Sequence, residues 1–278
     1  MIKLRVFLFG LALVTAAPVC SRGQSLGAPE TVVVQSGGLT LRGLLWWPAG
    51  QRPFAAVLFN HGAGSPDPTK QPAVIGPVFA RHGYAFLYLF RRGAGLSADQ
   101  GTNSGALMAR ALAEKGQDAR NALQLQLQEV ELGDVIAGLA FLRSHPGVDG
   151  RRVAIAGHSF GGQLTLLAAE RDAGVRAVVT FAAAANSWGN SPELRERLLI
   201  AVRNIQMPIF LTHAANDLSV LPGQVLAAEL DRLKRRHELK IYPAVGDTPA
   251  AGHSAVYADV ASWELDLFRF LDEHVRPR

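Results

Sequence analysis

The stretch RRVAIAGHSFGG, residues 151–162, constrains this chain more than any other part of its sequence. An apolar run at 153–156 predicts a buried strand, and the apolar segment at 163–170 predicts a helix. Between them Ser159 has Gly157 two residues before it and Gly161 two residues after it. A serine on such a sharp turn has a strained backbone, and small neighbours let strand and helix approach each other. Ser159 is therefore predicted to be a nucleophile; a glycine-rich turn that only joins strand to helix is the alternative.

Strands and helices alternate along most of the chain. Apolar runs typical of strands lie at 31–34, 39–47, 53–59, 84–90, 153–156, 175–181, 208–213 and 239–242. Helical patterns lie at 72–82, 118–144, 163–170, 222–236 and 255–274, with one short helix within 186–206 and a helical patch at 107–113 in the polar stretch 98–117. This order predicts an α/β fold with a mostly parallel central sheet and helices on both faces. The first two strands are expected to form a hairpin, and the 26 residues at 182–207 leave no room for a large cap domain.

The length and composition fit one globular domain. The chain has 278 residues, of which 49% are hydrophobic and 18% charged, which excludes a disordered protein. Residues 1–23 are predicted to be a signal peptide, because Lys3 and Arg5 precede a short apolar run that small residues follow. The run is too short for a membrane span, and an apolar N-terminal arm is the alternative. We therefore expect an exported, periplasmic or secreted protein with one domain at 24–278.

The net charge depends largely on that leader. Without residues 1–23 the formal charge falls from +5 to +2, because Lys3, Arg5 and Arg22 leave with it. The sequence contains no stripe of Lys and Arg interleaved with aromatic residues, so no nucleic-acid partner is predicted. Cys20 is the single cysteine, so the domain at 24–278 is expected to have no disulfide and no cysteine metal site. Lipidation of Cys20 is disfavoured, because the residues before it match a lipoprotein signal poorly.

An acid and a histidine follow later strands, where a serine nucleophile needs them. Asp217 comes directly after the strand predicted at 208–213, and His253 follows the strand at 239–242. Catalytic groups of parallel α/β sheets gather at the carboxyl ends of the strands, and Ser, acid, His is the chain order that this architecture uses. The alternatives are that Asp217 caps the next helix, that Asp247 is the acid, or that His253 is a surface histidine.

The remaining histidines fit structural roles. His82, His145, His237 and His274 lie at predicted helix ends or on solvated faces, and His158 is expected to pack rather than to catalyse. No two histidines have the spacing of metal ligands with an acid nearby, so no metal is expected.

Attack on a carbonyl creates an oxyanion, which needs two preorganised donors. The backbone N–H of Phe160, directly after the nucleophile, is one predicted donor. The other is expected from the loop His61-Gly62-Ala63-Gly64, with Ala63 favoured and Gly62 second. A plain glycine-rich turn after a strand is the alternative for this loop.

Five segments, 54–64, 91–97, 156–162, 212–222 and 252–254, together resemble the dienelactone hydrolase branch of the α/β-hydrolase superfamily, and the similarity spans roughly residues 30–275. The resemblance implies a serine hydrolase that acts on esters or lactones without a cofactor. Dienelactone hydrolase itself is known for a cysteine nucleophile, whereas the matching position here is Ser159. The expected small-molecule substrate is therefore an ester or lactone rather than dienelactone in particular.

Substrate contacts are less defined by the sequence. Trp188 is a hypothetical lining residue of the acyl pocket, and Arg91 or Arg92 could bind a substrate carboxylate. An arginine pair that holds its own loop is the favoured alternative. A peptidase or acyltransferase with the same triad stays open, as does a non-catalytic exported binding protein. Nothing in the sequence indicates the oligomeric state.

Overall fold

In a computed structural model of the protein, the structure describes Met1 and residues 27–171 and 174–276. Nearly all of the predicted signal peptide, including Cys20, lies outside these residues, so export and lipidation stay predictions. Within the described ranges, no helix combines the length and the apolar character needed to cross a membrane.

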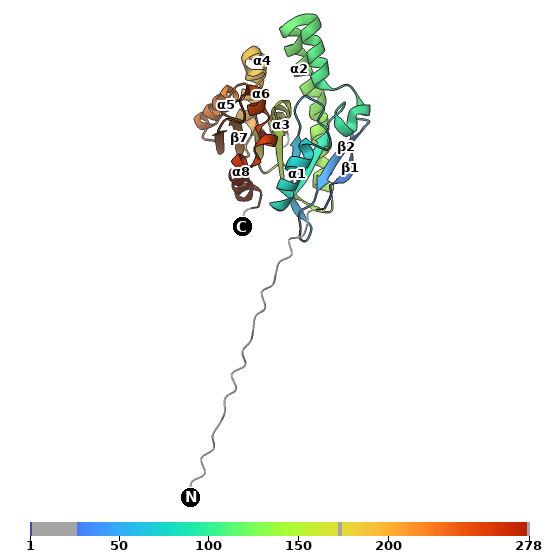
Figure 1. The fold of residues 1–278 in the computed structure, drawn as a ribbon, viewed down its shortest axis with the longest axis vertical. Coiled ribbons are helices and arrows are strands. Elements are labelled where there is room, and N and C mark those ends of the chain that lie inside the picture. Colours follow the sequence, from blue (N-terminus) through green and yellow to red (C-terminus); the bar gives the residue numbers. More distant parts are fainter. Residues whose placement is uncertain (2–26, 172–173, 277–278) are drawn as a thin grey trace.

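An eight-stranded sheet forms the centre of the molecule, with the order β1-β2-β4-β3-β5-β6-β7-β8 (Figure 1). β1 pairs antiparallel with β2, and β2 pairs antiparallel with β4, while every other neighbouring pair is parallel. The strands are β1 (Glu30–Ser36), β2 (Leu39–Trp46), β3 (Phe54–Asn60), β4 (Tyr84–Phe90), β5 (Val148–His158), β6 (Val178–Phe181), β7 (Ile209–Ala214) and β8 (His237–Tyr242). The predicted α/β-hydrolase sheet and its opening hairpin are thereby confirmed.

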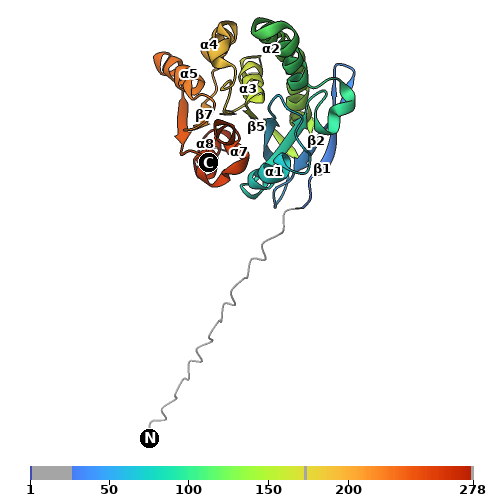
Figure 2. The ribbon, with the colours of Figure 1, turned by 45° about the horizontal axis from the view of Figure 1, so that its top comes forward.

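Helices cover both faces of this sheet (Figure 2). The helices α2 (Ser104–Ser144), α3 (Phe160–Arg171), α4 (Pro192–Asn204) and α5 (Leu221–Arg232) lie on one face, and α1 (Gln71–Arg81), α7 (Ala255–Ala258) and α8 (Val260–Val275) lie on the other. α6 (Pro249–His253) and the short 3₁₀ helices η1 (Gly95–Gln100) and η2 (Trp188–Asn190) lie in the connections. Each face of the sheet has its own apolar core.

The apolar pattern explains these layers. All seven residues of β4 are buried, as expected for a strand that helices cover on both sides. The buried residues of α8 recur three or four positions apart and include Trp263, Leu267 and Leu271. This spacing places one apolar stripe of the helix against the sheet.

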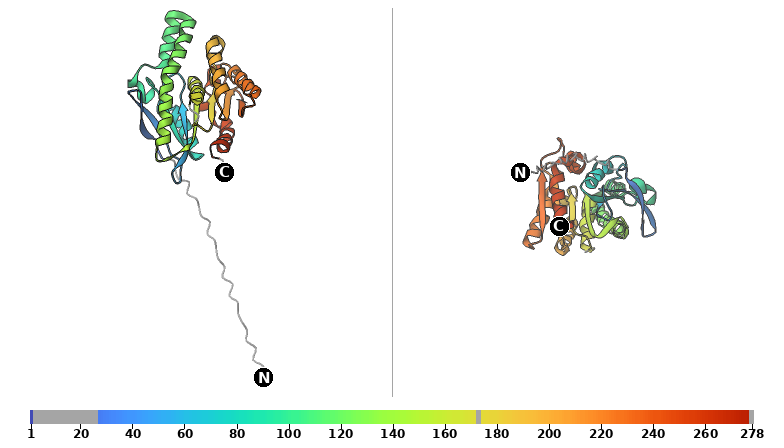
Figure 3. Two further views of the ribbon diagram at one scale, coloured as in Figure 1. Left: turned by 180° about the vertical axis from the view of Figure 1, so that it is seen from behind. Right: turned by 90° about the horizontal axis from the view of Figure 1, so that it is seen from below.

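The structure corrects two helix predictions. α2 begins at Ser104 rather than near 118, because Asn103 accepts a hydrogen bond from the Ala106 N–H and caps the first turn. Gly116 interrupts the helix with a φ of 83°. The view from behind in Figure 3 shows α2 extending beyond the rest of the body. The predicted last helix is divided into α7 and α8, which meet at Asp259.

Candidate active site

Ser159 lies at the predicted elbow, between the last residue of β5 and the first residue of α3. Its φ of 56° is in the left-handed region, which is strained for a residue with a side chain. A Cβ atom on Gly161 would stand 2.2 Å from the carbonyl oxygens of Asn60 and His61. The turn therefore needs glycine there for steric reasons, and the resulting close approach of β3 and α3 holds Ser159 at the edge of the sheet.

The structure brings the three residues predicted as a triad together. His253 ends α6, and its Nε2 atom lies 2.9 Å from the Oγ atom of Ser159. Its Nδ1 atom lies 2.7 Å from Oδ1 of Asp217, in the loop after β7. Asp247, the alternative acid, is exposed. The contacts form a continuous chain from carboxylate to imidazole to hydroxyl.

A second histidine contacts the same carboxylate, and the sequence reasoning missed it. Nδ1 of His213, on β7, lies 2.7 Å from Oδ2 of Asp217, and both side chains are almost fully buried. Although burial acts to raise it, hydrogen bonds from His213 and His253 lower the pKa of Asp217 to about 2. The spacing of four residues between His213 and Asp217 at a strand end was the available signal.

The loop after β3 lies beside the nucleophile. A Cβ atom on Gly62 would stand 3.5 Å from Cβ of Ser159, so the backbone of the loop approaches the elbow closely. The carbonyl of Ala63 accepts a hydrogen bond from the Gly105 N–H at the start of α2. Phe160 is the first residue of α3, so its N–H has no acceptor within the helix. These placements agree with the expected roles of Phe160, Ala63 and Gly62 as oxyanion donors, which stay a prediction.

Arg91 has a different environment from that of a substrate-binding cation. Its side chain is fully buried, and its Nε atom donates to Glu131 at 2.6 Å. Nη2 donates to the carbonyls of His61 and Gly62 at 2.8 and 3.0 Å. The hypothesis of a substrate carboxylate at Arg91 is corrected: the guanidinium is used to hold the loop that passes Ser159.

The Arg92 guanidinium is likewise bound to another side chain of the protein. Its Nε and Nη2 atoms donate to Asp134 of α2 at 2.9 and 2.7 Å. The Asp134 side chain is fully buried, and its charge requires this partner. The favoured alternative, an arginine pair that holds its own loop, describes both residues better than a carboxylate site.

Trp188 lies in the protein core. Only 4% of its surface is exposed, and it packs within the apolar cluster on the face of α2 to α5. It lines neither of the two cavities beside the triad. The hypothesis that Trp188 lines the acyl pocket is corrected, because its side chain is buried in that core cluster.

His158 supports the triad from the other side. Its Nε2 donates to the backbone carbonyl of His253 at 2.8 Å, since a carbonyl can only accept. Burial, together with the neighbouring His253, lowers the pKa of His158 to about 4. A neutral His158 therefore fixes the position of the loop that carries the base, as the expected packing role requires.

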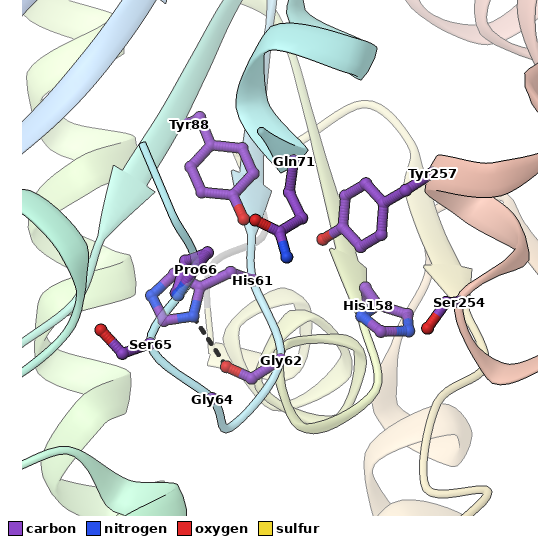
Figure 4. Close-up of a pocket in the computed structure, with 10 residues that line it drawn as sticks. All are labelled: His61, Gly62, Gly64, Ser65, Pro66, Gln71, Tyr88, His158, Ser254 and Tyr257. Atoms are coloured by element: carbon purple, nitrogen blue, oxygen red, sulfur yellow. Dashed lines mark hydrogen bonds between the residues drawn. The ribbon is translucent and has the colours of Figure 1, made fainter. Parts of the chain in front are cut away.

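Two cavities flank these residues. The larger, of about 190 Å³, adjoins the triad through Gly62, His158 and Ser254 (Figure 4). A smaller one lies behind His253, between β7 and α7. Within the part of the chain that the structure describes, no group of three or more His, Cys, Asp or Glu side chains could hold a metal ion.

Comparison with known proteins agrees with this fold. A model of the dienelactone hydrolase family matches residues 41–271. The polyketide transferase grgF of a Penicillium species is 32% identical over 200 residues, which cover 69% of this chain and 60% of that protein. The chain thus spans less than two thirds of that curated relative.

Solved structures show the same architecture. Dienelactone hydrolase from Anabaena variabilis superposes with a TM-score of 0.62 at 20% identity, covering 90% of this chain and 100% of that one. An acylaminoacyl peptidase from Pyrococcus horikoshii has a TM-score of 0.62 at 17% identity, covering 92% of this chain and 43% of that one. At these identities the likeness concerns the fold alone.

Proposed function

The chain belongs to the dienelactone hydrolase family, and we propose that it is a serine hydrolase that cleaves carboxylic esters or lactones through an acyl-enzyme on Ser159. The observation that carries this proposal is the unbroken series of contacts from Asp217 Oδ1 through His253 to Ser159 Oγ. A serine hydroxyl needs such a base to become a nucleophile, and the base needs an orienting acid.

Each step follows from these contacts. His253 Nε2 takes the proton of Ser159 as Oγ attacks the acyl carbon, and Asp217 stabilises the imidazolium that forms. The backbone N–H groups of Phe160 and Ala63, or Gly62 in place of Ala63, stabilise the oxyanion. His253 then gives its proton to the leaving alkoxide, and the alcohol departs. Water attacks the acyl-enzyme by the same route, which releases the acid and restores Ser159.

The nucleophile assignment is tested with Ser159→Ala. We expect turnover of p-nitrophenyl esters and labelling by a fluorophosphonate to disappear together. Ser144→Ala, at the exposed end of α2, is the matched control and retains both. Ester turnover that persists in Ser159→Ala would overturn the proposal.

The acid assignment separates a functioning triad from chance proximity. Asp217→Asn is expected to lower kcat by roughly 10⁴-fold, the effect of this change in a serine protease triad, because the base loses its orientation. Asp247→Asn, at an exposed position in the loop before α6, is expected to leave kcat within about twofold of the wild type. The reverse result would identify Asp247 as the acid.

Acyl transfer is a second candidate, which the 32% identity to a polyketide transferase favours. An acyl-enzyme on Ser159 can pass its acyl group to an alcohol or an amine instead of water. Product analysis with added alcohols and amines distinguishes the two. A transferase gives new esters or amides as main products at millimolar acceptor, whereas a hydrolase gives the free acid.

A further inference from the structure

The larger cavity beside the triad has an unusual wall. Figure 4 shows the Tyr88 and Tyr257 hydroxyls and the Gln71 amide pointing toward its interior, from β4, α7 and the start of α1. His158, the neighbour of Ser159, and Ser254, the neighbour of His253, form the side next to the triad. A group that extends from an ester bound at Ser159 can therefore enter it.

Two polar atoms of this wall are buried without a well-formed hydrogen bond. Tyr88 is fully buried, and its hydroxyl interacts with the neighbouring Tyr257 hydroxyl without the geometry of a complete hydrogen bond. Oε1 of Gln71 has no hydrogen-bond partner among the described residues. A buried polar atom without a hydrogen bond is costly, so water or another bound molecule commonly supplies the bond. The donor of Tyr88 and the acceptor of Gln71 together match a group that both accepts and donates.

The wall carries no charge. Among its ten residues, all within the described ranges, there is no Asp, Glu, Lys or Arg. Burial lowers the pKa of His61 well below its usual value and that of His158 to about 4, so both rings are neutral near pH 7. Burial also raises the pKa of Tyr88 and keeps its hydroxyl protonated. The nearest cation, Arg91, lies behind the wall and is paired with Glu131, so a carboxylate would lose its hydration here without a direct ionic contact.

The shape of the cavity favours a flat group. Tyr88 stacks on Phe59 and on His61, with interplanar angles of 21° and 15°, and Tyr257 meets His158 edge-on. Four of the ten lining residues, His61, Tyr88, His158 and Tyr257, carry aromatic rings. A cavity of about 150 Å³ accepts benzene in another protein, so about 190 Å³ suits one ring with a small substituent.

We propose that this cavity binds an uncharged, ring-sized portion of the substrate that carries a hydroxyl group, which the Tyr88 hydroxyl and the Gln71 amide recognise. The proposal rests on the proposed function and names its substrate class: esters with a hydroxyaryl group in the acyl or the alcohol portion. Carboxylated substrates are excluded by the same walls.

Two matched ester series test this. The first compares methyl phenylpropanoate with its hydroxyphenyl and carboxyphenyl analogues, and the second compares the corresponding phenylethyl acetates. We expect the hydroxyphenyl ester of one series to exceed both analogues by roughly tenfold in kcat/KM. Tyr88→Phe should reduce this preference to below about threefold, because the ring stays and only the hydroxyl is lost.

Tyr84→Phe is the matched control, since the Tyr84 hydroxyl bonds Asp272 away from the cavity. It is expected to keep the preference. Gln71→Met, at the first residue of α1, provides a second test if Tyr88→Phe does not fold. Equal rates on plain and hydroxylated esters, a preference for the carboxylated ester, or an unchanged preference in both variants would overturn the proposal. If the protein is labelled by a fluorophosphonate but shows no preference for hydroxylated esters, only the cavity proposal is refuted. If the protein is not labelled and turns over no ester, the proposed hydrolase function is itself refuted.

Discussion

Nδ1 of His213 lies 2.7 Å from Oδ2 of Asp217. The other carboxylate oxygen, Oδ1, contacts His253 and accepts the backbone N–H of Leu218. Both oxygens of this buried acid are therefore hydrogen-bonded, and the carboxylate plane cannot rotate without breaking a bond. Gly223 of α5 leaves the space that His213 occupies, because a Cβ there would stand 2.7 Å from the imidazole. His213 is thus a positioning residue for the acid of the proposed triad.

Replacing His213 should weaken catalysis through the acid. His213→Leu leaves Oδ2 of Asp217 buried without its donor, and a hydrogen bond to a charged group contributes about 1.5–3 kcal/mol. We expect kcat to fall at least about tenfold with little change in KM. His213→Asn is the control, since its amide nitrogen can replace Nδ1 and should recover most of kcat. Equal losses in the two variants would mean that packing of the ring, rather than its hydrogen bond, is what matters.

Arg91 should affect stability and all substrates alike. Arg91→Met leaves Glu131 as a buried carboxylate without its cation and frees the carbonyls of His61 and Gly62. Breaking a buried ion pair costs about 3–5 kcal/mol, so urea unfolding should show a loss of this size. The kcat/KM values of neutral and acidic esters should fall by the same factor. A loss confined to acidic esters would restore the carboxylate-binding hypothesis.

Replacing glycine by alanine is expected to have opposite effects on stability at two positions. Gly161→Ala places a Cβ 2.2 Å from two backbone oxygens, which can be relieved only by moving the end of β3 away from α3. We expect a loss of about 3 kcal/mol in unfolding free energy and no measurable ester turnover. Gly133→Ala, on an exposed part of α2 with no atom within 4 Å of the new Cβ, should gain up to about 1 kcal/mol and keep full activity. Active Gly161→Ala would show that the elbow tolerates a wider approach.

The elbow and the fold class were predictable because their signals are local. The glycines around Ser159 are required by the steric crowding of a single turn. Apolar strand-like runs that alternate with helical patterns indicate a parallel sheet. Asp217 and His253 could be chosen because the carboxyl ends of parallel strands share one edge. Only the structure shows that His253 lies within hydrogen-bond distance of both Asp217 and Ser159; the order of these residues in the sequence does not establish it.

The errors concern contacts between distant segments. Arg91 follows a predicted strand at the edge of the sheet where the site was expected. Its guanidinium is instead paired with Glu131 on α2, forty residues away in the sequence. The sequence contains no periodic signal that pairs those two residues. Trp188 fits a pocket by its position after a strand, yet its burial depends on how α2, α3 and α4 pack together. The second bond of Asp217 was missed for a different reason: His213 is only four residues away, but the irregular loop after β7 has no periodicity that predicts which of its side chains meet.

His158 should make the protein less stable in mild acid. Its pKa is about 4 in the folded protein, against an ordinary value of 6.5. Between these values the unfolded chain binds a proton that the native state does not, so stability decreases as the pH falls from 6.5 to about 4 and loses nothing further below it. A shift of this size corresponds to about 3 kcal/mol.

The variant His158→Gln isolates this contribution. The glutamine amide can still donate to the carbonyl of His253, but it does not titrate. Burial also lowers the pKa of His61, and this contribution largely cancels in the comparison, because the charge of His158 is the smallest of the causes that act on His61. Urea unfolding at about pH 7 and about pH 4 should therefore show a pH-dependent loss about 3 kcal/mol smaller in His158→Gln than in the wild type. If the two proteins lose the same free energy over this range, His158 is protonated in the native state and the imidazole is more hydrated than its burial implies.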